Sequence, residues 1–253
     1  LDAAFILLHG VHGEDGTIQG FLDLLNIPYQ GAGVLGSALA MDKQLAKNLY
    51  ALHGVPVARG AMARPEHINN PQPLLEQVAV PCVVKPVKQG SSIGMSIVTE
   101  EEQLSPALEK AFAHDREVLV EAYVAGRELT VGVLGNEELE ALPLIEIIPD
   151  SRFSFFDYEA KYVAGASQEI CPAEVDASIK EQAQAHALTA HRCLQLRGYS
   201  RTDMILGEDG LVILETNTIP GMTPTSLLPQ AAAEAGYPFP QLLDKLIELA
   251  MEK

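Results

Sequence analysis

The chain has 253 residues, 47% of them hydrophobic, and a formal net charge of −17 at pH 7. This length and apolar content allow a buried core and lie at the upper edge of one domain, so two or three small lobes are equally compatible with them. The acidic balance, without a stripe of Lys or Arg, argues against a nucleic-acid partner. The 3 isolated cysteines indicate neither a disulfide framework nor a thiolate metal site. Isolated cysteines fit a reducing cytoplasm, so we predict a cytoplasmic protein. No apolar run approaches the ~20 residues that span a bilayer and no signal-peptide pattern opens the chain, so we predict no membrane partner.

The N-terminal part of the chain is predicted to alternate between strand, loop and helix. Residues 3–8 form a short apolar run typical of a buried parallel strand, and its end opens into a loop. A helical pattern covers 17–25, and the glycines within 31–36 indicate irregular connections. Asp42 is expected to cap a helix that Gly54 ends, which indicates a boundary between lobes.

The next segment is predicted to be a strand pair followed by a helix. Strands are expected at 82–87 and 95–98, joined by a loop rich in glycine and serine at 88–94. Thr99 and Glu102 have the spacing of a capping box for the helix that follows.

The remaining elements are predicted from short apolar runs and turn residues. In chain order they are strands at 117–123, 128–134 and 139–148, a long loop at 151–172, a helix at 176–196 ending at Gly198, a hairpin of 199–206 and 211–217 with its turn at 208–210, and two final helices. A loop of this length inside a compact domain is usually a functional lid.

Four polar residues of the predicted hairpin are expected to share one face. Arg201 and Asp203 lie two positions apart on one strand, and the partner strand repeats this spacing. If the turn centres on Asp209, Asp203 lies opposite Glu215. The same register places Arg201 opposite Asn217. Two facing carboxylates repel, a cation between them removes that penalty, and oxygen and amide ligands suit Mg²⁺. A solvated sheet face that carries charge is the alternative.

The loop at 88–94 has the composition of a phosphate-binding flap. Its glycines let backbone N–H groups approach phosphate oxygens, Ser91 and Ser92 add donors, and Lys85 and Lys88 bring charge at its two ends. It is not a Walker A loop, because the GxxxxGK[ST] pattern is absent and a strand follows. A plain hairpin loop is the alternative.

Two further loops carry polar residues. The segment 9–16 sets His9, Glu14 and small residues directly after an apolar run, which suits a small polar substrate. Within the long loop, an aromatic cluster precedes Lys161 and Tyr162. This cluster is compatible either with a lid that excludes water or with a patch that packs the loop down.

Six motifs in order carry a family resemblance: HGVHGEDGTIQG, MDK, VVKPVKQGSSIGMS, FDYEAKY, SRTDMIL and ETNTIPGMTPTSL. The chain resembles the D-alanine:D-alanine ligases of the ATP-grasp superfamily over nearly its whole length. The resemblance implies an α/β fold with α+β lobes, in which the nucleotide is held between two mixed or antiparallel sheets. It divides the chain into 1–41 (the remainder of an N-terminal parallel α/β lobe), 42–121 (a central lobe with the phosphate-covering loop) and 122–253 (a C-terminal lobe with lid and metal site). Members of the family begin with a strand, a glycine loop and a glutamate, which we expect upstream of Leu1.

The resemblance also implies roles for individual residues. Those implied to bind ATP are Lys43, Lys85, Ser92, Glu121, Ala122, Tyr123, Val124, Glu128 and Lys161. The implied metal ligands are Asp203, Glu215 and Asn217, and the implied substrate-binding residues are His9, Glu14, Ser226 and Leu227. The implied catalytic residues are Arg201 and the Gly221 backbone at the oxyanion, Ser91 in the covering loop, and Tyr162, which is associated with dipeptide rather than ester formation.

The implied reaction joins two molecules of D-alanine through an acyl phosphate, with release of ADP and phosphate, for peptidoglycan precursor synthesis. Its cofactors would be ATP and two Mg²⁺ ions, with Mn²⁺ as a substitute, and the assembly a homodimer. The alternatives are a D-alanine:D-lactate ligase, another ATP-grasp carboxylate–amine ligase, and a nucleotide-binding module without catalysis.

Overall fold

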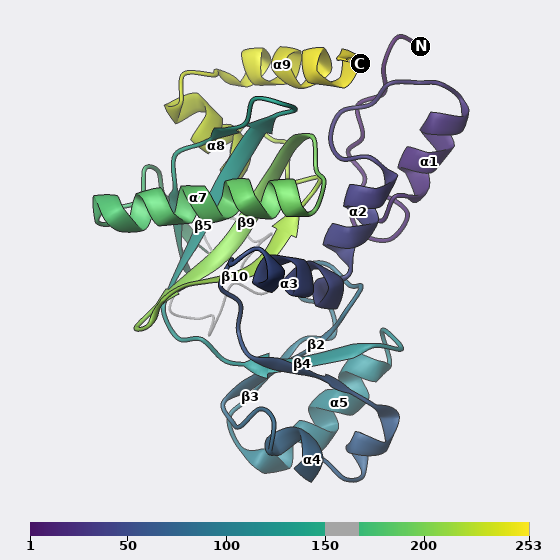
Figure 1. Ribbon diagram of the computed structural model, residues 1–253, viewed down its shortest axis with the longest axis vertical. Coiled ribbons are helices and arrows are strands. Elements are labelled where there is room, and N and C mark those ends of the chain that lie inside the picture. Colours follow the sequence, from purple (N-terminus) through teal and green to yellow (C-terminus); the bar gives the residue numbers. More distant parts are fainter. Residues whose placement is uncertain (150–166, 253) are drawn as a thin grey trace.

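The computed structural model describes residues 1–149 and 167–252. It contains a four-stranded sheet in the order β1-β4-β2-β3 and a six-stranded sheet in the order β10-β9-β5-β7-β8, with β6 paired to β5. All strand pairs within the two sheets are antiparallel. In Figure 1 the four-stranded sheet lies below the six-stranded one.

The strands are β1 (Gly60–Ala63), β2 (Cys82–Pro86), β3 (Ser96–Val98), β4 (Val118–Ala122), β5 (Arg127–Gly135), β6 (Glu140–Ala141), β7 (Ile145–Pro149), β8 (Ser167–Ile170), β9 (Gly198–Gly207) and β10 (Gly210–Asn217). The helices are α1 (Thr17–Leu24), α2 (Val34–Met41), α3 (Lys43–Leu52), α4 (Gln72–Leu75), α5 (Leu104–Phe112), α7 (Ala177–Cys193), α8 (Leu227–Glu234) and α9 (Phe239–Met251), with short 3₁₀ turns η1 (Pro65–Ile68) and η2 (Glu101–Gln103). Within the described residues, no helix has the length and apolar character needed to cross a bilayer.

Alternation along β2 divides the smaller sheet into two faces. Cys82 and Val84 belong to the core that α5 covers. Val83 and Lys85 point to the opposite side, where both line a cavity. One strand therefore contributes to the core and to the candidate site.

The larger sheet is organised in the same way, with α7 across one face (Figure 1). Leu129, Val131 and Val133 of β5 pack with α7 in one core. Glu128 lines the cavity, so the candidate site lies on the opposite face from α7.

Helix α3 lies between the two sheets (Figure 1). Asp42 caps it, because its side chain accepts a hydrogen bond from the N–H of Leu45 at 3.0 Å, as the sequence predicts. The N–H of Lys43 donates to the carbonyl of Val87 at 3.3 Å, which ties the start of the helix to the end of β2. The first turn of the helix therefore lies beside the loop at 88–94.

The strand predicted at residues 3–8 is wrong. Only Ala4 forms a parallel bridge, to Tyr29. The side chain of Gln30 serves as the partner of Ile6 instead, accepting from its N–H and donating to its carbonyl, each at 2.7 Å. Among the described residues, the backbone of Ile6 therefore forms its hydrogen bonds with the amide side chain of Gln30 and not with a neighbouring strand.

Two other local predictions are also wrong. Gly31 and Gly33 lie in an irregular connection, as expected, but Gly36 lies inside α2. Close packing requires glycine at position 36, because a Cβ atom there would lie 2.8 Å from the carbonyl oxygen of Gln195. The capping contact after β3 is made by Gln103 and not by Glu102: its Oε1 accepts from the N–H of Thr99 at 2.8 Å and from that of Glu100 at 3.2 Å.

Several strand bounds also differ from the sequence prediction. The strand expected at 139–148 is split into β6 and β7, with Leu142 and Leu144 buried between them. The end of the predicted long loop contains β8, and β1 was not predicted at all. The helix expected to end at Gly198 ends at Cys193. The division into three lobes stays a prediction.

Candidate active site

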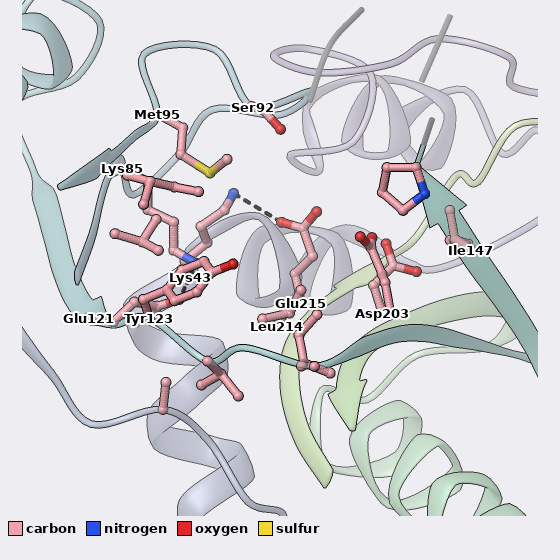
Figure 2. A pocket seen from close by; sticks show the side chains of 18 of the residues that line it. Lys43, Lys85, Ser92, Met95, Glu121, Tyr123, Ile147, Asp203, Leu214 and Glu215 are labelled. Carbon is pink, nitrogen blue, oxygen red and sulfur yellow. Dashed lines mark hydrogen bonds and ion pairs between the residues drawn. The ribbon is translucent and has the colours of Figure 1, made fainter. Parts of the chain in front are cut away.

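A cavity of about 510 Å³ lies between the two sheets. Its wall includes these residues with predicted roles: Lys43, Lys85, Ser91, Ser92, Glu121, Ala122, Tyr123, Val124, Glu128, Asp203 and Glu215. Figure 2 shows side chains from both sheets converging on this space. The residues implied to handle nucleotide and metal are therefore largely gathered at one site.

The β9–β10 hairpin pairs Asp203 with Glu215 and Arg201 with Asn217, as predicted. The predicted reason was incomplete. Gly207 pairs with Gly210 around a two-residue turn, and the register then shifts by one residue between Ile213 and Glu215. The extra residue is Leu214, a β-bulge.

The bulge changes which side chains reach the cavity. Consecutive residues of a regular strand point to opposite faces, but Leu214 and Glu215 both line the cavity. Figure 2 shows the carboxylates of Asp203 and Glu215 side by side, with Leu214 next to them. An apolar wall and a negative charge thus come from adjacent positions.

Asp203 accepts hydrogen bonds from three neighbours, of which the Thr130 hydroxyl donates to Oδ1 at 2.6 Å. Arg201 donates to both of its oxygens, from Nε at 2.8 Å and from Nη2 at 2.7 Å. Asn217 donates from Nδ2 to Oδ2 at 2.9 Å. Burial alone would lower the pKa of Arg201, but the charge of Asp203 raises it above its ordinary value. Arg201 therefore stays charged beside the cavity.

The donor set on the hairpin fits Mg²⁺. Within the described residues, no three acidic, imidazole or thiol side chains gather at one point. An ion here would therefore need the oxygen of the Asn217 amide together with Asp203 and Glu215, and it would share Asp203 with Arg201. Hard oxygen ligands of this kind are those that Mg²⁺ prefers.

Lys43 connects β10 to the loop at 88–94. Its Nζ lies 3.3 Å from Oε2 of Glu215, the ion pair drawn in Figure 2, and donates to the carbonyl of Gln89 at 2.7 Å. In that loop Ser91 and Ser92 have φ values of 50° and 57°, in the left-handed region that few residues other than glycine adopt. Such backbone strain is concentrated at ligand-binding loops.

Lys88 does not reach the cavity. It forms ion pairs with Glu117 and, at 3.4 Å, with Asp42. Only the N-terminal lysine of the predicted pair, Lys85, therefore offers its charge to a ligand, and Lys88 anchors the base of the loop.

Lys85 and Glu121 form a buried ion pair at 2.5 Å. The second oxygen of Glu121 lies 3.0 Å from Nζ of Lys47, a residue of α3. Burial would raise the pKa of Glu121, but the charges of Lys85 and Lys47 lower it. Glu121 is thus a carboxylate that orients two lysines, in addition to lining the cavity.

The predicted substrate-side residues do not line the cavity. Glu14 accepts from the N–H of Gly10 at 2.7 Å, and His9 is exposed. Burial raises the pKa of Glu14, and the charge of Glu215 raises it further, so this loop lies within electrostatic reach of the hairpin.

The C-terminal residues with predicted roles lie together at the start of α8. A side chain at Gly221 would come within 3.0 Å of Oγ of Ser226. That hydroxyl contacts the hydroxyl of Thr223 at 2.7 Å. Leu227 is buried in the core beneath α8. Lys161 and Tyr162 lie outside the described residues.

The family models match both ends of the chain. The description "D-ala D-ala ligase N-terminus" matches residues 1–32, and "D-ala D-ala ligase C-terminus" matches residues 49–248. The chain belongs to the D-alanine–D-alanine ligase family. Its ATP-grasp fold is that of the solved members described next.

Similar proteins include family members from several bacteria. The "D-alanine--D-alanine ligase" of Desulfotalea psychrophila is 57% identical, with 100% of this chain and 79% of that protein covered. The protein of the same name from Syntrophobacter fumaroxidans is 56% identical, with 100% and 81% covered. Among solved structures, the VanG D-Ala:D-Ser ligase of Enterococcus faecalis has a TM-score of 0.87 at 39% identity, covering 99% of this chain and 73% of its own. The D-alanine-D-alanine ligase of Coxiella burnetii has a TM-score of 0.86 at 34% identity, covering 98% and 67%.

Among the residues that sequence reasoning missed are Lys47, behind the cavity, and Leu214, in its wall. Lys47 follows Lys43 by four positions, a spacing that places both on one helix face and could have revealed it. Leu214 could not be found in this way, because a regular period of two assigns it to the opposite face. Its position depends on the bulge.

Proposed function

We propose that this chain joins two molecules of D-alanine into D-alanyl-D-alanine with consumption of ATP. The observation that carries the proposal is the cavity between the sheets, lined by Lys43 and Lys85 and by the carboxylates of Asp203 and Glu215, with Lys43 directed at Glu215 (Figure 2). This arrangement suits a triphosphate that bridges cations of one wall and a metal held by the other. The family's use of ATP agrees with it.

The reaction has two steps. The γ-phosphoryl group of ATP passes to a carboxylate oxygen of the first D-alanine, giving an acyl phosphate and ADP. The amine of the second D-alanine then attacks the carbonyl carbon, the bond to phosphate breaks, and the amine loses a proton. Activation is needed because a carboxylate is a poor electrophile.

Residues of this chain would act mainly by positioning and by neutralising charge. Lys43 and Lys85 would bind phosphate oxygens, while Ser91 and Ser92 cover them. Mg²⁺ at the hairpin would supply further neutralisation of the phosphates. The guanidinium of Arg201 would stabilise the oxyanion of the tetrahedral intermediate, with the N–H of Gly221 as second donor.

The base would lie against the apolar part of the wall. Val83, Ile97 and Ile147 come from three strands, and Leu214 adds a fourth apolar side chain. The link of Ala122, Tyr123 and Val124 runs from one sheet toward the other, and Glu128, which lines the same cavity, would take the ribose hydroxyls. An apolar slot closed by a backbone edge suits a purine.

The decisive experiment measures phosphate release with ATP, Mg²⁺ and D-alanine. D-Serine and D-lactate are compared with D-alanine as the second substrate, because one solved relative is a D-Ala:D-Ser ligase. We expect D-alanine to give the highest kcat/KM. Preference for D-lactate would support the ester-forming alternative, and Mg²⁺-dependent ATP binding without phosphate release would support the non-catalytic module.

Other features of the family remain proposals for this chain. These are the roles of Lys161 and Tyr162, the two Mg²⁺ ions with Mn²⁺ as a substitute, the homodimer, the cytoplasmic location and the contribution to peptidoglycan precursors. His9, Glu14, Ser226 and Leu227 remain the proposed substrate-binding residues.

A further inference from the structure

Lys47 is a buried cation behind the cavity that the proposed mechanism does not use. Its side chain is 6% exposed, and its Nζ lies 3.0 Å from Oε2 of Glu121. The same Nζ donates to the carbonyl oxygen of Ile213 at 3.5 Å. Lys47 is not part of the cavity wall, so it does not reach a bound ligand directly.

Glu121 places Lys47 and Lys85 on either side of one carboxylate. Its Oε1 accepts from Nζ of Lys85 at 2.5 Å, and its own side chain is 3% exposed. Lys85 also lines the cavity. When all three groups are ionised, two positive charges and one negative charge leave a net charge of +1 next to the phosphate-binding space. Without Lys47 the remaining pair is neutral.

We infer that Lys47 is a positioning residue that neutralises Glu121, so that Lys85 keeps an uncompensated positive charge for the ATP phosphates. This inference rests on the proposed function. If Lys85 were the only partner of the buried Glu121 carboxylate, the carboxylate would neutralise its charge, because the attraction within an ion pair is strong where water is excluded. With Lys47 on its second oxygen, Glu121 can orient Lys85 and still leave its charge available.

Lys47 also joins three elements at one point. It comes from α3, Glu121 from β4, and Ile213 from β10, immediately before the bulge that presents Leu214 and Glu215. The contact with Ile213 therefore connects the lysine side of the cavity with the carboxylate side. Loss of the Lys47 side chain would affect the phosphate site without removing any group that touches ATP.

The test compares four variants with the unchanged chain by calorimetric ATP binding in Mg²⁺ and by steady-state kinetics. We expect Lys47→Met to raise the Kd and the KM for ATP about tenfold while the KM for D-alanine changes little. Lys47→Arg keeps the charge and is expected to bind ATP within about threefold of the unchanged chain. Lys180→Met, an exposed position on α7, is the matched control and should bind ATP normally.

The decisive variant combines Lys47→Met with Glu121→Gln. Removal of the carboxylate charge restores the net charge of Lys85, so the double variant should bind ATP more tightly than Lys47→Met alone. A double variant as weak as the single one, or weaker, would overturn the inference and leave Lys47 a packing residue. Failure of the proposed function is distinguishable, because the unchanged chain would then show no Mg²⁺-dependent ATP binding or no phosphate release.

Discussion

Glu215 shows how one side chain serves several neighbours in this site. It lies 3.3 Å from Lys43, stands opposite Asp203 in the hairpin, and contributes to the raised pKa of Glu14. Its carboxylate therefore interacts with a lysine, a second carboxylate and the loop that carries Glu14. A change of its charge should affect chemistry far more than folding, because the side chain is 27% exposed.

We expect Glu215→Gln to lower phosphate release at least about 100-fold, since the amide is nearly isosteric but lacks the charge that holds a cation. Phosphate release in the presence of D-alanine measures the loss, and circular dichroism checks that the fold is retained. Near-normal turnover would contradict the role of Glu215 as a metal ligand.

His191 affects stability rather than the site. It is fully buried, its Nδ1 contacts the Ser200 hydroxyl at 2.8 Å, and burial lowers its pKa to about 4. The unfolded chain binds a proton near pH 6.5, while the folded chain does not until about pH 4. The contribution of neutral His191 to the free energy of unfolding is therefore fully present above pH 6.5 and is lost as the pH falls to about 4. The free energy of unfolding changes by roughly 3 kcal/mol over this range.

Urea unfolding between pH 7 and 4 tests this expectation. His191→Gln should flatten the pH dependence of the free energy of unfolding, even if stability at neutral pH also falls. The same substitution at the exposed His53 should leave the slope unchanged. An equally steep slope in His191→Gln would show that other groups cause the acid sensitivity.

At the residue scale, the motifs predicted the charged and hydroxyl-bearing residues Lys43, Lys85 and Ser92 of the cavity wall, but they did not predict which side chains contact each other. Alternation along the strands predicted that Asp203 and Glu215 share a face, but their pairing depends on the bulge at Leu214, which the sequence did not predict. The bidentate pairing of Arg201 with Asp203 was not predicted, because it depends on side-chain conformations. The orientation of Lys85 by Glu121 depends on contact between two strands that are distant in the sequence.

Among the elements, α3 connects stability to the site most directly. It is capped by Asp42, begins at Lys43, and carries Lys47 one turn later. Tyr50, near its end, donates to the hydroxyl of Thr216 on β10 at 2.8 Å. The helix is therefore fixed to the larger sheet at one end and beside the covering loop at the other.

We expect Asp42→Ala to destabilise the fold by about 1 kcal/mol, because the N–H of Leu45 loses its partner at the helix start. Denaturant titration measures the change. Asp176→Ala is the matched control: Asp176 stands at the same position of α7 but makes no capping hydrogen bond there. Equal losses in both variants would show that the hydrogen bond of Asp42 is not the cause.

Element types were predictable where a period or a cap was clear, and failed where packing decided. The hairpin and α3 followed from alternation and from Asp42. Helix α2 was missed because Gly36, together with the glycines before the helix, looks like part of a loop, although close packing against Gln195 requires glycine there. The apolar run at 3–8 looks like a strand, but Gln30 provides its hydrogen bonds instead.

At the scale of the molecule, the cavity wall is shared by both sheets, and a ligand there would bind them together. We expect saturating ATP with Mg²⁺, at about 100 times its Kd, to stabilise the folded chain by about 2.7 kcal/mol. For a chain of this size that corresponds to a rise in Tm of roughly 5–10 °C.

Thermal unfolding with and without EDTA tests the contribution of the metal. Chelation should remove most of the rise in Tm produced by ATP, since the phosphates would then lie beside Asp203 and Glu215 without a cation between them. A rise that is unchanged by EDTA would contradict the metal site. The unchanged chain without nucleotide, heated with EDTA, is the control.

The two faces of the larger sheet have a consequence for substitution libraries. On β5, positions 129, 131 and 133 support α7, whereas position 128 borders the ligand space. Substitutions at the core positions of this strand should therefore lower protein abundance, whereas a substitution at the cavity position should lower turnover. On β10 the phase should switch at Leu214, since odd positions before the bulge belong to the α7 core and Glu215 after it lines the cavity. A scan that recorded only protein abundance would not detect the effect of substitutions at the hairpin positions that line the cavity.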